Sequence, residues 1–247
     1  MFVNSSTGYA FGEEIYLTTT NAGVTWQQHP FPYYIVGSTF TNDLTGYIAG
    51  KSRNEHDTNV VLKTTNGGLN WSKYYMQQTY TYGAKIKFVN QTTGYVYADR
   101  RVMRTTNAGI SWIYFEVPGV NKDFDVFGDR MITADYYTST ITGRSLPKVF
   151  WSTDGGTDWN SYSPTIPANT NSFGMFARII DNNKFYFLAG DLNYADRLYR
   201  TANGGNNWSQ VNTDPNCRNI DFIDYDNPYT FLPGNDSSMI SRSTNGG

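Results

Sequence analysis

Short runs of hydrophobic and aromatic residues recur along the whole chain, separated by turns rich in Asn and Gly. In one clear copy, runs at residues 85–89, 95–98, 102–105 and 111–117 predict four β-strands, and residues 90–94 predict the first turn. Apolar runs of this length between Asn-Gly-type turns are typical of strands joined by hairpins. The pattern predicts an all-β chain with little helix.

An eight-residue segment, called the turn repeat below, dominates the sequence. Its copies read TTNAGVTW, TTNGGLNW, TTNAGISW, STDGGTDW, TANGGNNW and a shortened STNGG, and their third positions lie 41 to 49 residues apart. That period, with four strands per copy, matches the size of a propeller blade. The third and eighth positions are Asn21, Trp26, Asn66, Trp71, Asn107, Trp112, Asp154, Trp159, Asn203, Trp208 and Asn245.

A second motif, Phe-x-Asn-x-x-Thr-Gly-Tyr, precedes the turn repeat at residues 2–9, 40–47 and 88–95, with a looser copy at 222–229. Both motifs predict a single all-β domain, a β-propeller of six four-stranded antiparallel blades whose last blade is incomplete. We expect the chain to be a fragment of a longer protein. The alternative to six blades is a seventh blade in that longer protein. The expected blades are approximately residues 1–32, 33–80, 81–120, 121–167, 168–214 and 215–247.

The residue types of the turn repeat suit a tight turn. An Asn or Asp side-chain oxygen can accept backbone N–H groups two residues on, and Gly at the fifth position can adopt a positive φ. We expect the Trp to lie against a neighbouring blade, where full burial would contribute about 5 kcal/mol at most. Because all but one of the third positions are Asn, a charge is not required there. A structural role is therefore favoured over metal binding or catalysis.

These residues resemble the Asp-box, or BNR, repeat family, Ser/Thr-x-Asp-x-Gly-x-Thr-Trp. Together with the upstream motif, they look similar to the Ycf48-like propellers related to photosystem II assembly factors. The resemblance covers nearly the whole chain and implies a β-propeller. It implies little about function, because the box also recurs in sialidases, xyloglucan hydrolases and sortilin-type receptors.

Charge and composition exclude several classes of function. The formal net charge is −2, from 19 basic and 21 acidic residues without a long run of either sign, which argues against nucleic-acid binding. Cys217 is the only cysteine, so neither an intrachain disulfide nor a cysteine-based metal site is expected. No run of 18 apolar residues occurs, so direct membrane insertion is not expected. No cofactor or metal is predicted.

Catalysis finds little support in the sequence. Sialidases of this fold need a Tyr–Glu nucleophile pair, and of the four Glu residues only Glu55 lies in a loop that could overhang a central channel. Glycosidases use two nearby carboxylates, and a pair of Asp135 with Asp196 is conceivable but unsupported. A glycoside hydrolase or lectin therefore stays as the alternative to a non-catalytic module.

The loops between the second and third strand of each blade, the B–C loops, are the predicted binding side. They vary in length, with insertions at residues 51–59, 135–148 and 191–197, and long variable loops on a rigid scaffold are where function concentrates. The alternative is that these loops have merely drifted. The candidate binding residues are Arg53, Glu55, His56, Tyr136, Tyr137, Arg144, Tyr194 and Arg197.

A row of cations shares one repeat position, immediately before the turn repeat: Lys63, Arg104, Arg200 and Arg242. It either faces solvent between blades or forms a surface for an anionic partner. The leading hypothesis is a non-catalytic, extracytoplasmic interaction module, bacterial and part of a larger surface or secreted protein. It would bind a protein partner or a glycan. A weaker alternative, from the resemblance alone, is an assembly factor for a membrane complex.

Overall fold

The computed structural model describes residues 1–52, 59–76, 85–98, 101–119, 123–165, 172–191, 197–211, 219–224, 227–232 and 239–242. Within these ranges the chain forms antiparallel β-strands and no helix, as the sequence predicts. It divides into two compact units, unit 1 at Met1–Glu116 and unit 2 at Val117–Gly247. The predicted blade boundaries and the single domain stay predictions.

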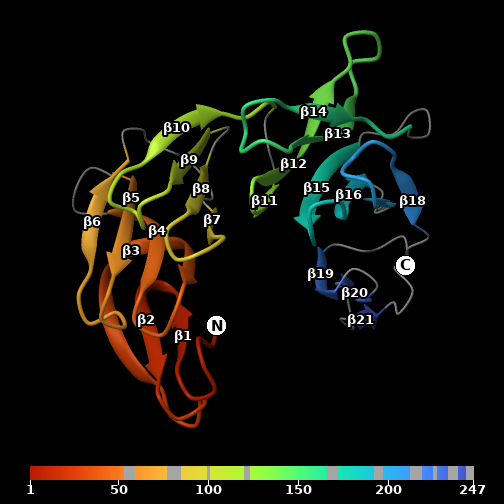
Figure 1. Cartoon of the computed structure of the whole chain (residues 1–247). Coiled ribbons are helices and arrows are strands. Elements are labelled where there is room, and N and C mark those ends of the chain that lie inside the picture. Colours follow the sequence, from red (N-terminus) through yellow and green to blue (C-terminus); the bar gives the residue numbers. More distant parts are fainter. Residues whose placement is uncertain are drawn as a thin grey trace. The chain divides into compact units, whose positions relative to one another are not determined.

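Unit 1 contains two antiparallel sheets, one of six strands and one of four (Figure 1). The first holds β1 to β6 in chain order, and the second has the order β10-β9-β8-β7. The strands are β1 Gly8–Phe11, β2 Glu13–Thr19, β3 Gln27–Phe40, β4 Gly46–Ser52, β5 Asn59–Thr64, β6 Ser72–Tyr75, β7 Lys85–Phe88, β8 Gly94–Ala98, β9 Arg101–Thr105 and β10 Ile113–Glu116.

The long strand β3 joins two repeats. Its first half pairs with β2 and its second half with β4, and Tyr34 has a partner on both sides, Glu13 and Lys51. No Asn-Gly-type turn interrupts residues 27–40, so the chain passes from one repeat to the next without a loop. The expected boundary at residue 32 lies inside this strand.

Unit 2 contains three antiparallel sheets, with the orders β11-β12-β13-β14, β15-β16-β17-β18 and β19-β20-β21. Its strands are β11 Asp123–Phe127, β12 Arg130–Thr138, β13 Ser145–Ser152, β14 Asn160–Tyr162, β15 Ser172–Ile179, β16 Phe185–Asp191, β17 Arg197–Thr201, β18 Ser209–Val211, β19 Asn219–Asp224, β20 Asn227–Leu232 and β21 Met239–Arg242.

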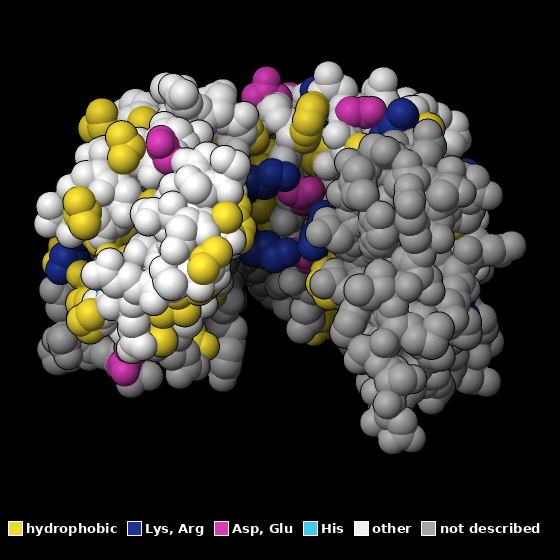
Figure 2. Space-filling model, turned by 90° about the horizontal axis from the view of Figure 1, so that it is seen from below, with side chains coloured by type: hydrophobic (Ala, Val, Ile, Leu, Met, Phe, Trp, Pro, Cys, Tyr) yellow, Lys and Arg dark blue, Asp and Glu magenta, His cyan; other side chains and the backbone are white. Residues whose placement is uncertain are grey.

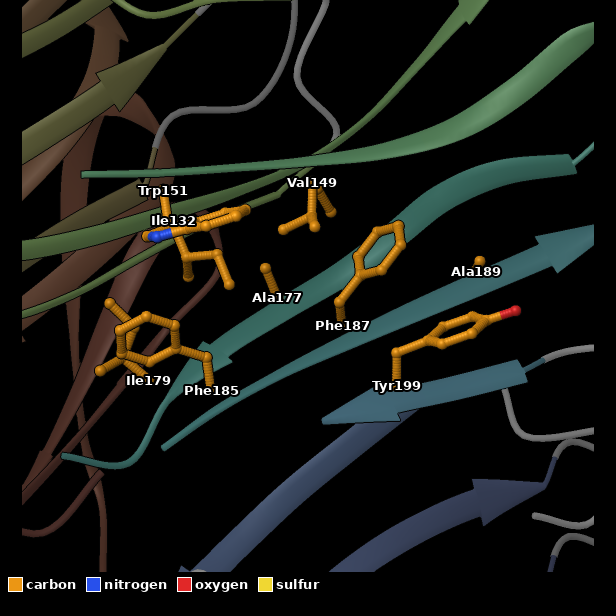
Figure 3. Close-up of a cluster of buried hydrophobic side chains, with 10 residues drawn as sticks. Ile132, Val149, Trp151, Ala177, Ile179, Phe185, Phe187, Ala189 and Tyr199 are labelled. Atoms are coloured by element: carbon orange, nitrogen blue, oxygen red, sulfur yellow. The ribbon is translucent and has the colours of Figure 1, made fainter. Parts of the chain in front are cut away.

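The core of unit 2 lies on both faces of β16. Phe185, Phe187 and Ala189 point to one face, where they pack with Ile132 and Trp151 in the cluster shown in Figure 3. The alternate residues of β16 pack on the other face with β17 and β18. A strand covered on both faces is continuously apolar rather than alternating, which explains the run Phe-Tyr-Phe-Leu-Ala.

No helix among the described residues has the length and apolarity needed to cross a membrane.

Candidate functional site

The five turn repeats within the described ranges share one hydrogen-bond network. In the first, the Thr19 hydroxyl donates to Oδ1 of Asn21 at 2.9 Å and accepts the N–H of Gly23 at 3.0 Å. The Asn21 Oδ1 also accepts the N–H of Thr25 at 2.9 Å. The Asn21 oxygen thus accepts the N–H four residues further on, that of Thr25. The N–H two residues further on, that of Gly23, is accepted by the Thr19 hydroxyl instead. Equivalent networks start at Thr64, Thr105, Ser152 and Thr201.

The one carboxylate in this network behaves as the amides do. Asp154 Oδ1 accepts the Ser152 hydroxyl at 2.7 Å and the backbone N–H groups of Thr157 and Asp158. The Ser152 hydrogen bond, followed by the backbone bonds, lowers the pKa of Asp154 below its usual value. The fifth-position glycine has a positive φ in each described copy, for example 84° at Gly23. The five networks stabilise turns. The sixth copy, with Asn245, lies outside the described residues.

The eighth-position tryptophans pack against aromatic residues that precede them in the chain. The Trp71 ring lies 5.7 Å from Phe31 in β3, and the Trp208 ring lies 5.8 Å from Trp151 in β13. Their burial is uneven, because Trp112 is 6% exposed whereas Trp26 is 39% exposed. The stabilisation expected for a fully buried indole therefore does not apply to Trp26. The indole N–H of Trp159 donates to the carbonyl of Gly156 in its own turn repeat at 3.0 Å.

The Phe-x-Asn-x-x-Thr-Gly-Tyr motif links neighbouring repeats in unit 1. The Tyr47 ring stacks on Phe88 of the next copy at 3.8 Å, and its hydroxyl donates to the carbonyl of Ala108 in the next turn repeat. Glycine precedes the tyrosine because the Phe of the same motif covers it: a Cβ at Gly46 would lie 2.5 Å from the Phe40 ring. The copies with Tyr9 and Tyr47 therefore each close on themselves and contact the following repeat.

The two turns at one end of each sheet are bonded to each other. The fourth residue of the turn repeat donates its N–H to a carbonyl of the turn between the first two strands of the same repeat, as Gly67 does to Leu44 at 2.9 Å. The other described copies have the same bond: Ala22 to Ser6, Ala108 to Thr92, Gly155 to Asp129 and Gly204 to Asn183. At this end of each described repeat, the two turns are therefore tied together by their own backbone.

Two members of the cation row, Lys63 and Arg104, lie over aromatic rings. The Lys63 ammonium donates to the carbonyl of Ala108 at 2.7 Å and lies 5.7 Å from the centre of the Tyr47 ring. Arg104 lies over Tyr95 at 5.9 Å. Arg200 and Arg242 stand opposite Tyr186 and Tyr229 in their sheets. Because Lys63 is bound within unit 1, its position links two repeats rather than facing solvent, and it does not offer a free cation to a partner.

The predicted binding residues are only partly within the described ranges. Arg53, Glu55, His56 and Tyr194 lie outside them. Arg197 begins β17, opposite Ala189 and partly buried. Tyr136, Tyr137 and Arg144 lie together on one hairpin of unit 2. The expected gathering of residues from several blades stays a prediction.

The insertion at residues 135–148, named the arm, is an ordered hairpin rather than an irregular loop. It consists of the ends of β12 and β13, beyond Ala134, where pairing with β11 ends, and before Val149, where pairing with β14 begins. The Ser139 N–H donates to the carbonyl of Arg144 and closes the turn. Figure 1 shows this hairpin projecting beyond its sheet.

The arm presents aromatic and apolar side chains to solvent. Tyr137 is 41% exposed, and Ile141 at the tip is 94% exposed. The ammonium of Lys148 lies 5.6 Å from the centre of the Tyr137 ring and 4.9 Å from that of Phe150. Sequence reasoning missed Lys148 and Phe150 as candidates. The signal that could have found them is the alternation of residues 146, 148 and 150 along a strand, which places their side chains on one face.

Three buried carboxylates in unit 2 are engaged in structural bonds. Asp123 Oδ2 accepts the N–H of Ala177 and forms an ion pair with Arg178 at 2.6 Å. Asp125 Oδ2 accepts the N–H of Ile179 at 2.9 Å, and Asp135 Oδ1 accepts the N–H of Tyr136. The proposed catalytic partner of Asp135, Asp196, lies outside the described residues. Within the described part of the chain, no group of three or more His, Cys, Asp or Glu could hold a metal ion.

The space-filling view supports a surface of low charge. On the unit 1 side of Figure 2, charged side chains are sparse, and hydrophobic side chains form small separate groups. Three exposed apolar residues of unit 1 occupy the sixth position of a turn repeat, namely Val24, Leu69 and Ile110. Singly exposed apolar residues are ordinary on soluble surfaces, so none of them marks a site by itself.

No protein-family model matches the chain, and neither does any curated protein. Solved structures do. An ancestral GH74 enzyme is similar at a TM-score of 0.69 and 14% identity, over 98% of this chain and 40% of that chain. The GH74 xyloglucanase from Xanthomonas campestris is similar at a TM-score of 0.64 and 13% identity, over 97% of this chain and 43% of that chain.

The fold is a β-propeller. The similarity extends to a structure described as Ycf48 bound to D1 peptide, at a TM-score of 0.45 and 18% identity, over 93% of this chain and 87% of that chain. The propeller spans less than half the length of the GH74 enzymes it resembles. At these identities the likeness shows the fold alone, and the blade number of six stays a prediction.

Proposed function

We propose that this propeller is a non-catalytic interaction module that binds a protein partner through its B–C side, with the arm as the main contact. The observation that carries the proposal is the arm itself, an ordered hairpin that projects from its sheet with Tyr137 and Ile141 exposed. Tyr and Arg are enriched at the energetic centres of protein interfaces. The opposite end, by contrast, uses its backbone in bonds between its own turns.

The carboxylates support the non-catalytic part of the proposal. A general acid or nucleophile needs an oxygen available to the substrate, whereas Asp123 and Asp125 accept backbone N–H groups from β15. A glycoside hydrolase or lectin on the same face is the alternative function. Similarity to GH74 enzymes does not favour it, because fold does not determine function.

The finer assignments are part of the same proposal. We infer that the turn repeats are Asp-box repeats, that the propeller has six blades, and that it works outside the cytoplasm on a bacterial surface or in a secreted protein. The repeated hydrogen-bond network and the low-charge, Thr/Asn/Tyr-rich composition support these inferences. A role as an assembly factor for a membrane complex is the weaker alternative.

Site-specific photocrosslinking in cells that make the protein tests this function. A photoreactive phenylalanine at Tyr137 should yield a defined covalent adduct with one partner protein. The matched control is Tyr75 in β6, an exposed tyrosine in unit 1 at 50% exposure. Identical adducts from both positions, or none from position 137, would contradict the proposal. Release of new reducing ends from xyloglucan or other glycans by the purified chain would establish the enzyme alternative.

A further inference from the structure

The arm carries positive charge in a protein that is slightly acidic overall. Residues 135–148 include Arg144 and Lys148 and one acidic residue, Asp135, which is buried and accepts the N–H of Tyr136, whereas the whole chain has a formal net charge of −2. Charge complementarity steers association and selects partners. A local excess of cations on a projecting hairpin therefore favours a partner surface of opposite sign.

The backbone edges of the arm lack outward donors at one residue pair near its middle. In an antiparallel pair, alternate residues direct their N–H groups to the partner strand and away from it. Tyr136 and Pro147 stand opposite each other in the hairpin. Because proline has no N–H to donate to the opposite strand, this is a pair whose backbone groups point away from the hairpin. The outward N–H of Tyr136 donates to Oδ1 of Asp135 at 2.6 Å. Both edges thus lack a free donor at mid-arm, which is how natural sheets prevent edge pairing.

The side chains on one face of the arm are ordered before any partner arrives. Tyr137 and Lys148 project from the same face of the hairpin, together with Phe150 in the adjoining part of β13. The Lys148 ammonium lies over both rings, which restricts a long side chain that would otherwise lose rotamer freedom on binding. The rings hold the lysine without neutralising it, and Asp135, its partner across the hairpin, is buried and accepts the N–H of Tyr136.

We propose that the arm binds an acidic segment of a protein partner through this face, and not by strand addition. Carboxylates of the segment meet Lys148 and Arg144, while its apolar atoms pack on the Tyr137 ring. The inference rests on the proposed interaction function and specifies the chemistry of the partner.

Binding of fluorescently labelled poly-L-glutamate of about 20 residues to the full chain, followed by anisotropy at low salt, tests the inference. We expect saturable binding that weakens as salt rises. Lys148→Gln and Tyr137→Ala should each weaken it, by about fivefold to tenfold, because each removes an interface contact of about 1 kcal/mol or more. Lys73→Gln is the matched control, since it removes the same charge from a lysine that lies 5.0 Å over the ring of Tyr75 in β6.

The outcomes separate this inference from the function on which it rests. Absence of poly-glutamate binding, or equal losses in Lys148→Gln and Lys73→Gln, would overturn the acidic partner. Tighter binding of oligogalacturonate of the same charge would also overturn it, in favour of an acidic glycan. An arm-specific crosslink obtained without poly-glutamate binding would refute the acidic chemistry alone. Failure of the crosslink would remove the interaction module itself.

Discussion

The first-position hydroxyl organises each turn repeat. Thr105 is almost fully buried, and its Oγ1 accepts the N–H of Gly109 while donating to Asn107. The neighbouring Thr106 is exposed. Two threonines in succession thus differ completely in what they contribute, although the sequence presents them as a pair.

Replacing the buried hydroxyl should destabilise the turn. Thr105→Val keeps the shape of the side chain but leaves the Gly109 N–H without its acceptor, which typically costs about 1–3 kcal/mol. Thr106→Val, the matched control, should change the free energy of unfolding by less than about 0.5 kcal/mol. Urea denaturation followed by tryptophan fluorescence measures both. Equal midpoints for the two variants would show that the hydroxyl is dispensable.

The lowered pKa of Asp154 makes the fourth turn repeat sensitive to acid. A carboxyl whose pKa is lower in the folded state stabilises the protein above its unfolded pKa of about 4, and the stabilisation is lost as pH falls through the folded pKa. Asp154→Asn should therefore be less stable than the wild type at pH 7, and the difference should shrink below about pH 4. Denaturation midpoints across pH measure this.

A reciprocal variant checks the assignment. Asn107→Asp places the same carboxyl in the third turn repeat, beside the Thr105 hydroxyl and the N–H of Ser111. It should acquire the acid sensitivity that Asp154→Asn loses. A pH profile unchanged in both variants would mean that the turn does not distinguish the two protonation states.

At the scale of elements, unit 2 joins two sheets through side chains. β15 is an edge strand in its own sheet, and carboxylates of β11 accept the N–H groups of Ala177 and Ile179 along that edge. Asp123 and Asp125 are two residues apart on β11, so both point to the same face. The pair takes the place that the carbonyls of a neighbouring strand would occupy.

Removing either acid should weaken this junction to different degrees. Asp125→Ala leaves the buried N–H of Ile179 unpaired, at a cost of about 1–3 kcal/mol. Asp123→Ala also removes the partner of Arg178, and breaking a buried ion pair costs about 3–5 kcal/mol. The expected order of unfolding midpoints is wild type, Asp125→Ala, Asp123→Ala. The reverse order of the two variants would show that the Arg178 pair contributes little.

The closed edge of the arm gives a second prediction at this scale. Pro147→Val restores an outward N–H on β13 at a residue that is itself buried, and an unpaired donor on a strand edge favours pairing with another chain. Sedimentation velocity should reveal self-association in this variant. Leu146→Val changes the neighbouring residue, whose N–H faces β12, and this variant should sediment as the wild type does. Monomers in both variants would show that proline does not protect the edge.

Local patterns were readable from the sequence and contacts between distant segments were not. The strands at residues 85–88 and 94–98 and the turn repeats depend on neighbours within a few residues, so their periodicity predicts them. The Asp123 and Arg178 pair joins segments more than 50 residues apart, and no local signal marks it. The sequence predicts a loop at residues 135–148, whereas the structure has a hairpin there, because the strand alternation of this segment is short.

At the scale of the whole molecule, both units pack through apolar and aromatic side chains, and unit 2 adds a charged junction between two of its sheets. In unit 1, rings such as Tyr47 stack on the next repeat and donate to its turn. In unit 2, the junction between β11 and β15 depends on charged groups, Asp123 and Arg178. Salt screens the partly exposed Arg178 guanidinium, whereas it does not weaken apolar packing. We therefore expect unit 2 to respond to ionic strength where unit 1 does not.

Hydrogen exchange measures this difference for each unit separately. In 1 M sodium chloride, amide protection in β15 should fall relative to its value in low salt, while protection in β4 and β8 should stay constant. The direct reporters are the N–H groups of Ala177 and Ile179, which the carboxylates accept. Uniform changes across both units would show that the charged junction has no special sensitivity.

The shared strand β3 limits where this chain could acquire new ends. A protease cut or a circular permutation in the middle of residues 27–40 would disturb two strand pairings at once. The first half of β3 pairs with β2, and the second half, from Tyr33 onward, pairs with β4. The tip of the arm, at residues 139–144, belongs to one hairpin only. Evolution by insertion or rearrangement would accordingly be tolerated at that tip and resisted in β3, so the first two repeats would be inherited as one block.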